Sequence, residues 1–385
     1  MSPPLEVADI FQNHGAAYLT HYGKRVPMSH RRAMRAIQIC RTAELGGHLD
    51  RCEQCGVQRI SYNSCRNRHC PKCQFLKAER WVEARKECLL PISYSHVVFT
   101  IPQELRAIVL RNQRLLYDVL FEAASATLRQ LSRDPKHLGA EIGFTMVLHT
   151  WSQTLAYHPH VHCIVTGGGL TTDGRWKATR DNFFLPVKVM SRLFRGKFLD
   201  KLRHLLRSRK LAFDTRLLDD LYRKEWIVYC KPPFHNAEHV VAYLGRYTHR
   251  IAISNHRLIA HDDTHVRFRY RASRHNNHSA TMSLDVLEFM RRFLLHVLPD
   301  GFVKIRHYGI LSNRSGKKLR QCRALLLTIW TASTPETETS WQDLLLRVAG
   351  VDVRVCGNCG GPMMLIEGLP PQRPPPEVPR TAAAA

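Results

Sequence analysis

Hydrophobic and polar positions follow two patterns along this chain, and each pattern predicts one kind of element. Runs rich in β-branched and aromatic residues predict short strands at residues 94–101, 142–151, 160–165, 226–230, 251–253, 266–271 and 281–284. Apolar residues at helical spacing predict helices around residues 31–37 and at 75–90, 103–131, 191–210, 237–250 and 285–297. Residues 322–348 are expected to mix helix and loop.

These elements predict an α+β fold, with a central antiparallel sheet and flanking helices preceded by a small N-terminal module. The strands at 142–151 and 160–165 are separated by few residues, so a hairpin-type connection is expected between them. The expected domains are an N-terminal domain at 1–90, a larger domain at 91–321, a C-terminal subdomain at 322–369 and a disordered proline- and alanine-rich tail at 370–385.

The charge of the chain indicates a polyanionic partner. Its 385 residues carry 57 Lys and Arg against 32 Asp and Glu, a net charge of +25. Such a field attracts nucleic acid and raises the rate of encounter. No apolar run reaches the roughly 20 residues that a membrane span needs, and no signal peptide is recognisable at the start. We therefore expect a soluble, intracellular protein whose 12 cysteines are metal ligands or reduced thiols.

Two Cys-x2-Cys pairs stand close together in the first domain, Cys52 with Cys55 and Cys70 with Cys73. Four thiolates delivered in this way match one tetrahedral structural zinc. Further candidates for this site, or for a role beside it, are Cys65, His69 and His48. Basic residues beside the cysteines are predicted to contact DNA: Arg66, Arg68 and Lys72. A later pair, Cys356 and Cys359, resembles half a zinc ribbon that is either completed by another domain or vestigial.

A His-x-His pair lies in the predicted strand at 160–165. Residues i and i+2 of a strand point to the same face, so His160 and His162 project together while Val161 points into the core. Two imidazoles on one face can bind a metal, and we expect a divalent ion, Mg or Mn, at this place.

A third metal ligand has to come from another position. The nearest candidates are Gln153 and His149, on the preceding strand and its turn, and the sequence does not choose between them. His158 has the same parity as His160, but Pro159 is expected to break the strand before it.

Tyr243 and Tyr247 are four residues apart in a predicted helix, so their phenols would lie side by side. Such a pair usually packs in a core, but here Arg246, His249 and Arg250 are interleaved with it, which favours a functional role. A phenol with a pKa near ~10 is a weak nucleophile. A metal ion that polarises a scissile phosphate, with Arg246 and Arg250 binding DNA nearby, would assist its attack.

Taken in order, these motifs resemble a known family. The segments His158–His162, Tyr243–Arg250 and Ile305–Gly309 resemble motifs of rolling-circle insertion-sequence transposases, the two-tyrosine branch of the HUH endonuclease superfamily (the insertion-sequence ninety-one family). The segment Ser64–Cys73 resembles the zinc-binding domain that precedes the catalytic domain there. The resemblance implies a single-strand DNA endonuclease and strand transferase with an HUH-type fold, a 5′-phosphotyrosine intermediate and a free 3′-hydroxyl. It places the metal on His160 and His162 and makes Tyr243 and Tyr247 the nucleophiles. It also implies that residues 1–90 form a zinc-binding, DNA-contacting domain and residues 91–321 the catalytic domain, in a bacterial protein of the cytoplasm that is used at the nucleoid.

The expected function is therefore that of a metal-dependent transposase acting on single-stranded DNA at element ends and target, with structural zinc and without a membrane or small-molecule substrate. A rolling-circle replication initiator or relaxase would use the same chemistry. A non-catalytic zinc-dependent DNA-binding protein would need the basic surface but neither Tyr243 nor Tyr247.

Overall fold

The computed structural model describes residues 5–86, 88–180, 184–234, 240, 245, 252–272, 278–326 and 340–372. The chain divides into two compact units, residues 1–77 with 336–385 and residues 78–335. This division differs from the predicted domains, because the C-terminal segment joins the N-terminal residues instead of forming a subdomain of its own. The predicted disordered tail lies, from residue 373 onward, outside the described residues.

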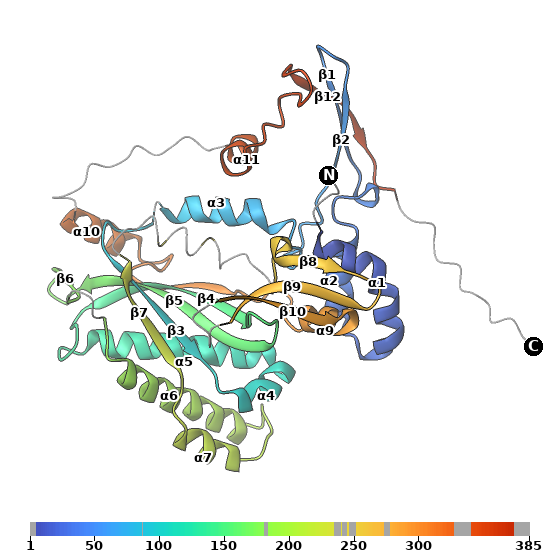
Figure 1. Ribbon diagram of the computed structural model, residues 1–385. Helices are drawn as coiled ribbons and strands as arrows, with labels where there is room; N and C mark the ends of the chain where they lie inside the picture. The colour runs from blue at the N-terminus through green and yellow to red at the C-terminus, as the bar shows by residue number, and fades with distance from the viewer. Residues whose placement is uncertain are drawn as a thin grey trace, which may run out of the picture. The chain divides into compact units, whose positions relative to one another are not determined.

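The larger unit, residues 78–335, is built on an antiparallel sheet (Figure 1). Its described strands run in the order β11-β4-β5-β3-β7, with β6 paired to β5. Their bounds are β3 Tyr94–Thr100, β4 Glu141–Trp151, β5 Tyr157–Leu170, β6 Trp176–Ala178, β7 Val228–Phe234 and β11 Ile305–Gly309. The short β4–β5 connection confirms the predicted hairpin, and the fold class is α+β as expected.

One face of this sheet carries the main hydrophobic core. The helices α5 (Gln113–Arg133) and α6 (Val187–Arg207) cover it, as Figure 1 shows below the sheet. Odd-numbered residues of β5, among them Val161, and even-numbered residues of β4, among them Phe144, are buried in this core. The alternation follows from the two-residue period of a strand. Further described helices of the unit are α7 Arg216–Arg223 and α10 Gly316–Leu326.

The helix predicted over residues 103–131 is divided in three. A 3-10 turn, η3 (Gln103–Leu105), leads into α4 (Arg106–Arg111), and α5 starts after Asn112. Asn112 has φ −128° and ψ 43°, and its side-chain amide donates to the carbonyl oxygen of Ile108 at 3.0 Å. The same oxygen also accepts the backbone N–H of Asn112 at 3.1 Å. An Asn that folds back on the last turn in this way ends a helix without Pro or Gly.

The opposite face of the sheet carries a smaller apolar cluster. Val147 of β4, Ile164 of β5 and Val240 pack together there, with Trp81 of α3 (Gln74–Lys86) against them. Val240 and Gly245 are helical, in agreement with the helix predicted at 237–250. Tyr243 and Tyr247 lie outside the described residues.

A second antiparallel sheet of the same unit has the order β10-β9-β8. Its elements are η4 Asn255–Arg257, β8 Leu258–His261, β9 His265–Ala272 and β10 His278–Asp285, followed by α9 Val286–Leu294. The prediction of a strand at 251–253 is wrong for its two described residues, since Ala252 has a positive φ of 45° and Ile253 belongs to no strand.

The smaller unit combines the two ends of the chain. Its described elements are α1 Val7–Tyr22, η1 Gly23–Arg25, α2 Met28–Gln38, η2 Ala43–Leu45, β1 Gly47–Cys52, β2 Gln58–Tyr62, α11 Trp341–Ala349 and β12 Met363–Leu369. The strand β12 pairs with β1 from Cys52↔Met363 to Gly47↔Leu369, and Figure 1 shows the red β12 beside the blue β1. The sheet has the order β12-β1-β2, so a strand from the C-terminal part completes the N-terminal module.

Candidate functional site

The predicted histidine pair lies on the sheet face opposite the main core. His160 and His162 project from β5 with their Nε2 atoms 3.0 Å apart, while Val161 between them is fully buried in the core. This confirms the orientation predicted from strand parity. His149 of β4 is the cross-strand neighbour of His160, and one ring nitrogen from each of the three histidines lies within 4.8 Å of the others.

One hydrogen bond fixes which ring nitrogen of His160 carries the proton. His160 Nδ1–H donates to the carbonyl oxygen of His158 at 2.6 Å, because a carbonyl can only accept. The lone pair of His160 therefore lies on Nε2, the atom that faces His162. The Nδ1 of His162 is 2.8 Å from the Nε2 of His96 on β3, and the two rings stack at an interplanar angle of 5°. His96 thus holds the second ring in position, as the outer partner of a metal-bound imidazole does.

Of the two candidates for a third ligand, His149 lies in one group with the pair. The side chain of His149 is 2% exposed and its ring lies 4.4 Å from that of His162. Gln153 is exposed at the β4–β5 turn, and its backbone oxygen accepts a hydrogen bond from Arg257. His96 was missed by the sequence reasoning, although its even position in the strand at 94–101 was a usable signal.

The expectation that Pro159 breaks the strand before His158 is wrong. The strand β5 starts at Tyr157 and runs through Pro159. The ladder with β4 shifts register between His149 and Trp151, and such an irregularity accommodates a residue without an N–H. His158 is turned to another partner, since Nη2 of Arg106 donates to its Nδ1 at 2.7 Å.

His160, His162 and His96 are neutral at neutral pH. Burial, with a smaller effect of His158, lowers the pKa of His160 to about 4. Burial also lowers the pKa of His162 well below its usual value, and the neighbouring His149, His160 and His96 lower it further. For His96, burial and then Lys231 lower the pKa to about 3. Neutral imidazoles keep a lone pair, so the group is suited to bind a divalent ion.

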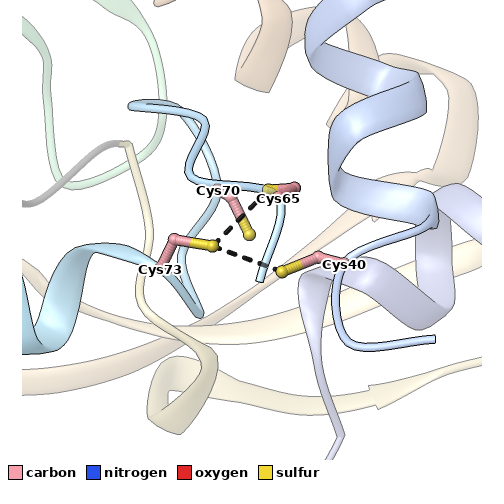
Figure 2. A group of neighbouring side chains, drawn as sticks. All are labelled: Cys40, Cys65, Cys70 and Cys73. Carbon is pink, nitrogen blue, oxygen red and sulfur yellow. Dashed lines mark hydrogen bonds between the residues drawn. The ribbon is translucent and has the colours of Figure 1, made fainter. Parts of the chain in front are cut away.

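The four cysteines predicted to share one zinc belong to two separate groups in the structure, so that grouping is wrong. Cys70 and Cys73 lie with Cys65 and Cys40, and we call this group the first cysteine site (Figure 2). The Sγ of Cys73 is 3.3 Å from that of Cys40 and 3.5 Å from that of Cys65. Thiolates around a tetrahedral zinc at about 2.3 Å lie about 3.8 Å apart, so four sulfur atoms at this spacing fit zinc.

The other pair, Cys52 and Cys55, lies with Cys356 and Cys359, and we call this group the split cysteine site. The separation follows from the chain path. Cys52 ends β1 and Cys55 follows directly, whereas β2 leads the chain back before Cys65. The Cys356 pair is therefore completed by another segment, one of the two alternatives that the sequence left open.

Of the three further zinc candidates, one belongs to a cysteine group and the two histidines do not. Cys65 is a member of the first cysteine site, and Cys40, at the end of α2, was missed because it belongs to no Cys-x2-Cys pair. His69 Nδ1 lies 3.2 Å from Oδ1 of Asn67, and His48 Nε2 lies 3.6 Å from Oδ2 of Asp50. Neither histidine is a member of a cysteine group.

The predicted DNA-contacting residues have different surroundings. Arg66 is exposed, Arg68 is half-buried, and Lys72 forms an ion pair with Glu6. Arg246 and Arg250 lie outside the described residues, as do the two tyrosines. No described helix is long and apolar enough to cross a membrane.

Comparisons with known proteins identify two matching families and two relatives. Residues 143–318 match the family described as "Putative transposase", and residues 10–101 match the family described as "Transposase zinc-binding domain". The chain is 48% identical to the "Putative transposase y4qJ" of Sinorhizobium fredii over 94% of this chain and 95% of that protein. It is 28% identical to the "Transposase for insertion sequence element IS801" of Pseudomonas savastanoi pv. phaseolicola, over 84% of this chain and 80% of that protein.

No solved structure matches the chain. The second family covers the first cysteine site and only half of the split cysteine site, since Cys356 and Cys359 lie beyond residue 101. The first family begins on β4 and covers His149, His160 and His162. With both families matched in order and a full-length relative at 48% identity, the chain belongs to the insertion-sequence transposases of the insertion-sequence ninety-one type, with an N-terminal transposase zinc-binding domain.

Proposed function

We propose that this transposase cleaves and rejoins single-stranded DNA through a 5′-phosphotyrosine intermediate, in rolling-circle-type transposition. One observation carries the proposal. His149, His160 and His162 lie together on the same face of the sheet as Val240, which belongs to the segment that contains the two tyrosines. Val147 and Ile164, which pack against Val240, are each two residues from a histidine of the group.

We infer that His160 and His162 hold the divalent ion, Mg or Mn, with His149 as the third ligand. Two donors at about 2.1 Å from an octahedral ion lie about 3.0 Å apart when they are adjacent. The Nε2 atoms of His160 and His162 have this separation. When bound, such an ion polarises the scissile phosphate and neutralises charge that develops on it. The contribution of His96 is to orient the His162 ring through the 2.8 Å contact.

The tyrosines follow Val240 at helical spacing. Tyr243 and Tyr247 are residues i+3 and i+7 from Val240, so the helix predicted at 237–250 would turn all three toward one side. Gly245 supports a close fit of this segment, since a Cβ added there would lie 2.5 Å from Val82 of α3. In the proposed reaction a phenol oxygen bonds to the phosphorus, the bond from phosphorus to the 3′-oxygen breaks, and the departing 3′-oxygen receives a proton.

Exchange of one phosphodiester for another is nearly isoenergetic. The 5′-phosphotyrosine therefore stores the bond energy, and attack by a 3′-hydroxyl of another strand reverses the first step and restores the phenol. Two tyrosines allow one cut end to stay attached while the second nucleophile opens another strand. The first cysteine site would hold the zinc of the N-terminal domain, as a structural ion.

The experiment incubates the full-length protein with Mn²⁺ and labelled single-stranded oligonucleotides from the element ends, and detects covalent protein–DNA adducts. We expect adducts with the wild type and none with Tyr243→Phe/Tyr247→Phe, because this change removes only the two phenol oxygens. Tyr222→Phe is the matched control and should leave the adduct yield unchanged. Tyr222 is an exposed tyrosine of α7, a helix whose Leu218 and Leu221 pack into the main core on the face opposite the histidines. His160→Ala and His162→Ala should bind the oligonucleotides normally and lose the adduct, whereas His204→Ala, on exposed α6 surface, should retain it.

Adducts of wild-type amount from the double tyrosine variant would place the nucleophile elsewhere. Binding without any adduct in the wild type would favour a non-catalytic zinc-dependent DNA-binding protein. A replication initiator or relaxase would form the same adduct, so a donor plasmid carrying the element is the second assay. Loss of element transfer in the tyrosine variants, with plasmid replication unchanged, is the result expected of a transposase.

A further inference from the structure

We propose that the split cysteine site binds a second structural zinc, which ties the C-terminal segment to the N-terminal module. The site consists of Cys52, Cys55, Cys356 and Cys359, and one sulfur atom from each lies within 4.8 Å of the others. The matched zinc-binding family ends at residue 101, so half of these ligands lie outside it. This zinc is separate from the one proposed for the first cysteine site.

The distances fit a metal rather than disulfides. The Sγ of Cys52 is 3.4 Å from that of Cys359, and the Sγ of Cys55 is 3.7 Å from that of Cys356. A disulfide would require about 2.05 Å, whereas thiolates around a tetrahedral zinc lie about 3.8 Å apart. Each short contact joins one cysteine of the first pair to one of the second, so the two pairs interleave around a common centre.

The two pairs have the same local backbone. In each, the residue after the second cysteine is a glycine with positive φ, 72° at Gly56 and 78° at Gly360. In each, the N–H of this glycine donates to the carbonyl oxygen of the first cysteine, at 3.0 Å for Gly56 and 2.9 Å for Gly360. This turn brings the two sulfur atoms of a Cys-x2-Cys pair to the same side, and only glycine adopts it at no steric cost.

Backbone amides also point at the sulfur atoms of the later pair. The N–H of Asn358 donates to Sγ of Cys356 and the N–H of Gly361 donates to Sγ of Cys359, both at 3.4 Å. Hydrogen bonds of this kind stabilise a thiolate, the form that binds zinc. Two reduced thiols without a metal would not need donors directed at both of them.

The strands beside the site give the zinc a structural role. Cys52 is paired with Met363 at the end of the β1–β12 ladder, directly next to the site. The side chains of β12 contribute little buried apolar surface, since Leu365 is 67% and Ile366 is 56% exposed. Backbone hydrogen bonds alone would hold this strand weakly, because each contributes only about 1 kcal/mol net. A zinc shared by both segments closes the chain over some 300 residues of sequence and fixes β12 in place.

The test measures zinc in the purified full-length protein and compares two double variants. Cys356→Ser/Cys359→Ser should contain one zinc fewer per chain than the wild type. Cys88→Ser/Cys230→Ser is the matched control, because neither residue belongs to a cysteine group, and it should contain as much zinc as the wild type. Zinc bound by the three histidines would add equally to all proteins and cancel in the difference. Equal zinc in the two double variants would refute the proposal.

A second measurement uses only the wild type, in case the variant fails to fold. Cys55 and Cys359 are exposed, so without a metal both thiols should react readily with an alkylating reagent. We expect both to be protected in the zinc-loaded protein and to react after a zinc chelator is added, while Cys88 reacts to the same extent in both states. Rapid alkylation of Cys55 and Cys359 in the zinc-loaded protein would contradict a zinc at this site. Neither measurement involves DNA, so its outcome is independent of the proposed cleavage chemistry.

Discussion

At the scale of single residues, His296 is a buried histidine outside the metal group with both ring nitrogens engaged. Its Nε2–H donates to the carbonyl oxygen of Leu155 at 3.1 Å, and its Nδ1 lies 3.1 Å from the Thr150 hydroxyl. The carbonyl can only accept, so the proton is on Nε2 and the threonine donates to Nδ1. Burial lowers the pKa of His296 to about 4. The folded protein therefore holds this side chain in its neutral form.

The lowered pKa of His296 predicts acid-dependent stability. The unfolded chain takes up this proton near pH 6.5 and the folded chain only near pH 4. The neutral side chain therefore contributes stability above pH 6.5, and this contribution is lost as the pH falls from 6.5 to about 4, up to roughly 3 kcal/mol. His296→Gln keeps a donor for Leu155 and cannot ionise. Between pH 7 and pH 4.5 the melting temperature of the wild type should fall further than that of this variant. An equal fall in both proteins would show that His296 does not titrate in this range.

The sequence was sufficient for the residues whose partners are close along the strand. Strand parity alone placed His160 and His162 on one face, and His149 was already a candidate because the hairpin returns it to the pair. His96 was missed because β3 joins β5 only in the folded sheet, with Val98 opposite His162. Cys40 gave no local signal, since it is a single cysteine at the end of a helix.

At the scale of elements, β9 and β10 form a two-sided ribbon with a basic face. Arg267, Arg269 and Arg271 are exposed on one side of β9, and Val266 and Phe268 are buried on the other. Across the ladder the arginines pair with Ser283, Thr281 and Ser279 of β10, which are also exposed. No ion pair involves any of the three arginines within the described part of the chain. We infer that this face binds the DNA backbone, since side chains about 6.8 Å apart can follow successive phosphates of an extended strand.

This ribbon is joined to the hairpin that carries the histidines. Nη2 of Arg257 donates to the backbone oxygen of Gln153 at 2.6 Å, and Nη1 of Arg292 donates to that of Thr154 at 3.2 Å. Both acceptors lie in the β4–β5 turn, a few residues from His149. Arg257 also donates through Nε to the backbone oxygen of Arg269 at 2.7 Å, so it links β9 to the turn of the histidine hairpin.

Removal of the basic face should weaken binding without removing the chemistry. Arg267→Gln/Arg269→Gln/Arg271→Gln should reduce affinity for single-stranded DNA and lower the salt dependence, the slope of log K against log salt, by about 2 if each arginine contacts one phosphate. The control Lys188→Gln/Arg192→Gln/Arg207→Gln makes the same charge change at exposed positions of α6, which packs on the core face of the main sheet, opposite the histidines. This control should change the slope little. Equal changes in slope for the two variants would indicate a general charge effect and contradict a DNA path along β9.

Elements with a strong local pattern were predicted well, and those set by a single side chain were not. The strands at 94–101 and 142–151 correspond to β3 and β4 almost residue for residue, because their apolar runs are buried on both faces. The break at Asn112 was missed, since it depends on one amide that caps α4. The strand expected at 251–253 was displaced by a turn at Ala252, for which the sequence carries no glycine signal.

At the scale of the whole molecule, the grouping of the cysteines shows the limit of spacing arguments. Cys55 and Cys70 are close in sequence, which favoured one zinc, but β1 and β2 separate their positions. The partners of Cys52 and Cys55 come from the opposite end of the chain. A contact across some 300 residues leaves no local pattern in the sequence. Completion of the Cys356 pair by another segment was therefore only one of two alternatives, the other being a vestigial site.

The two compact units should depend on zinc to different degrees. The larger unit has a core of fully buried aromatic side chains, among them Phe99, Phe144 and Phe194. In the smaller unit the β12-β1-β2 sheet exposes side chains such as Ile60, at 53%, and Leu365, at 67%. Little apolar surface stabilises that sheet, so its folding free energy should come largely from the metal. Loss of zinc should therefore destabilise the sheet of the smaller unit and leave the larger unit folded.

Hydrogen exchange, measured on the full-length protein with Mn²⁺ in excess, tests this difference. After a zinc-selective chelator is added, amides of β1, β2 and β12 should lose protection, because opening the sheet no longer breaks zinc–sulfur bonds. Amides of β4 and β5 should keep their protection, since their ladder is covered by the main core and its histidines can still bind manganese. Zinc added back should restore slow hydrogen exchange at the amides of β1, β2 and β12. Equal loss of protection in both units would show that they unfold together, and unchanged protection of β12 would show that the ladder with β1 needs no zinc.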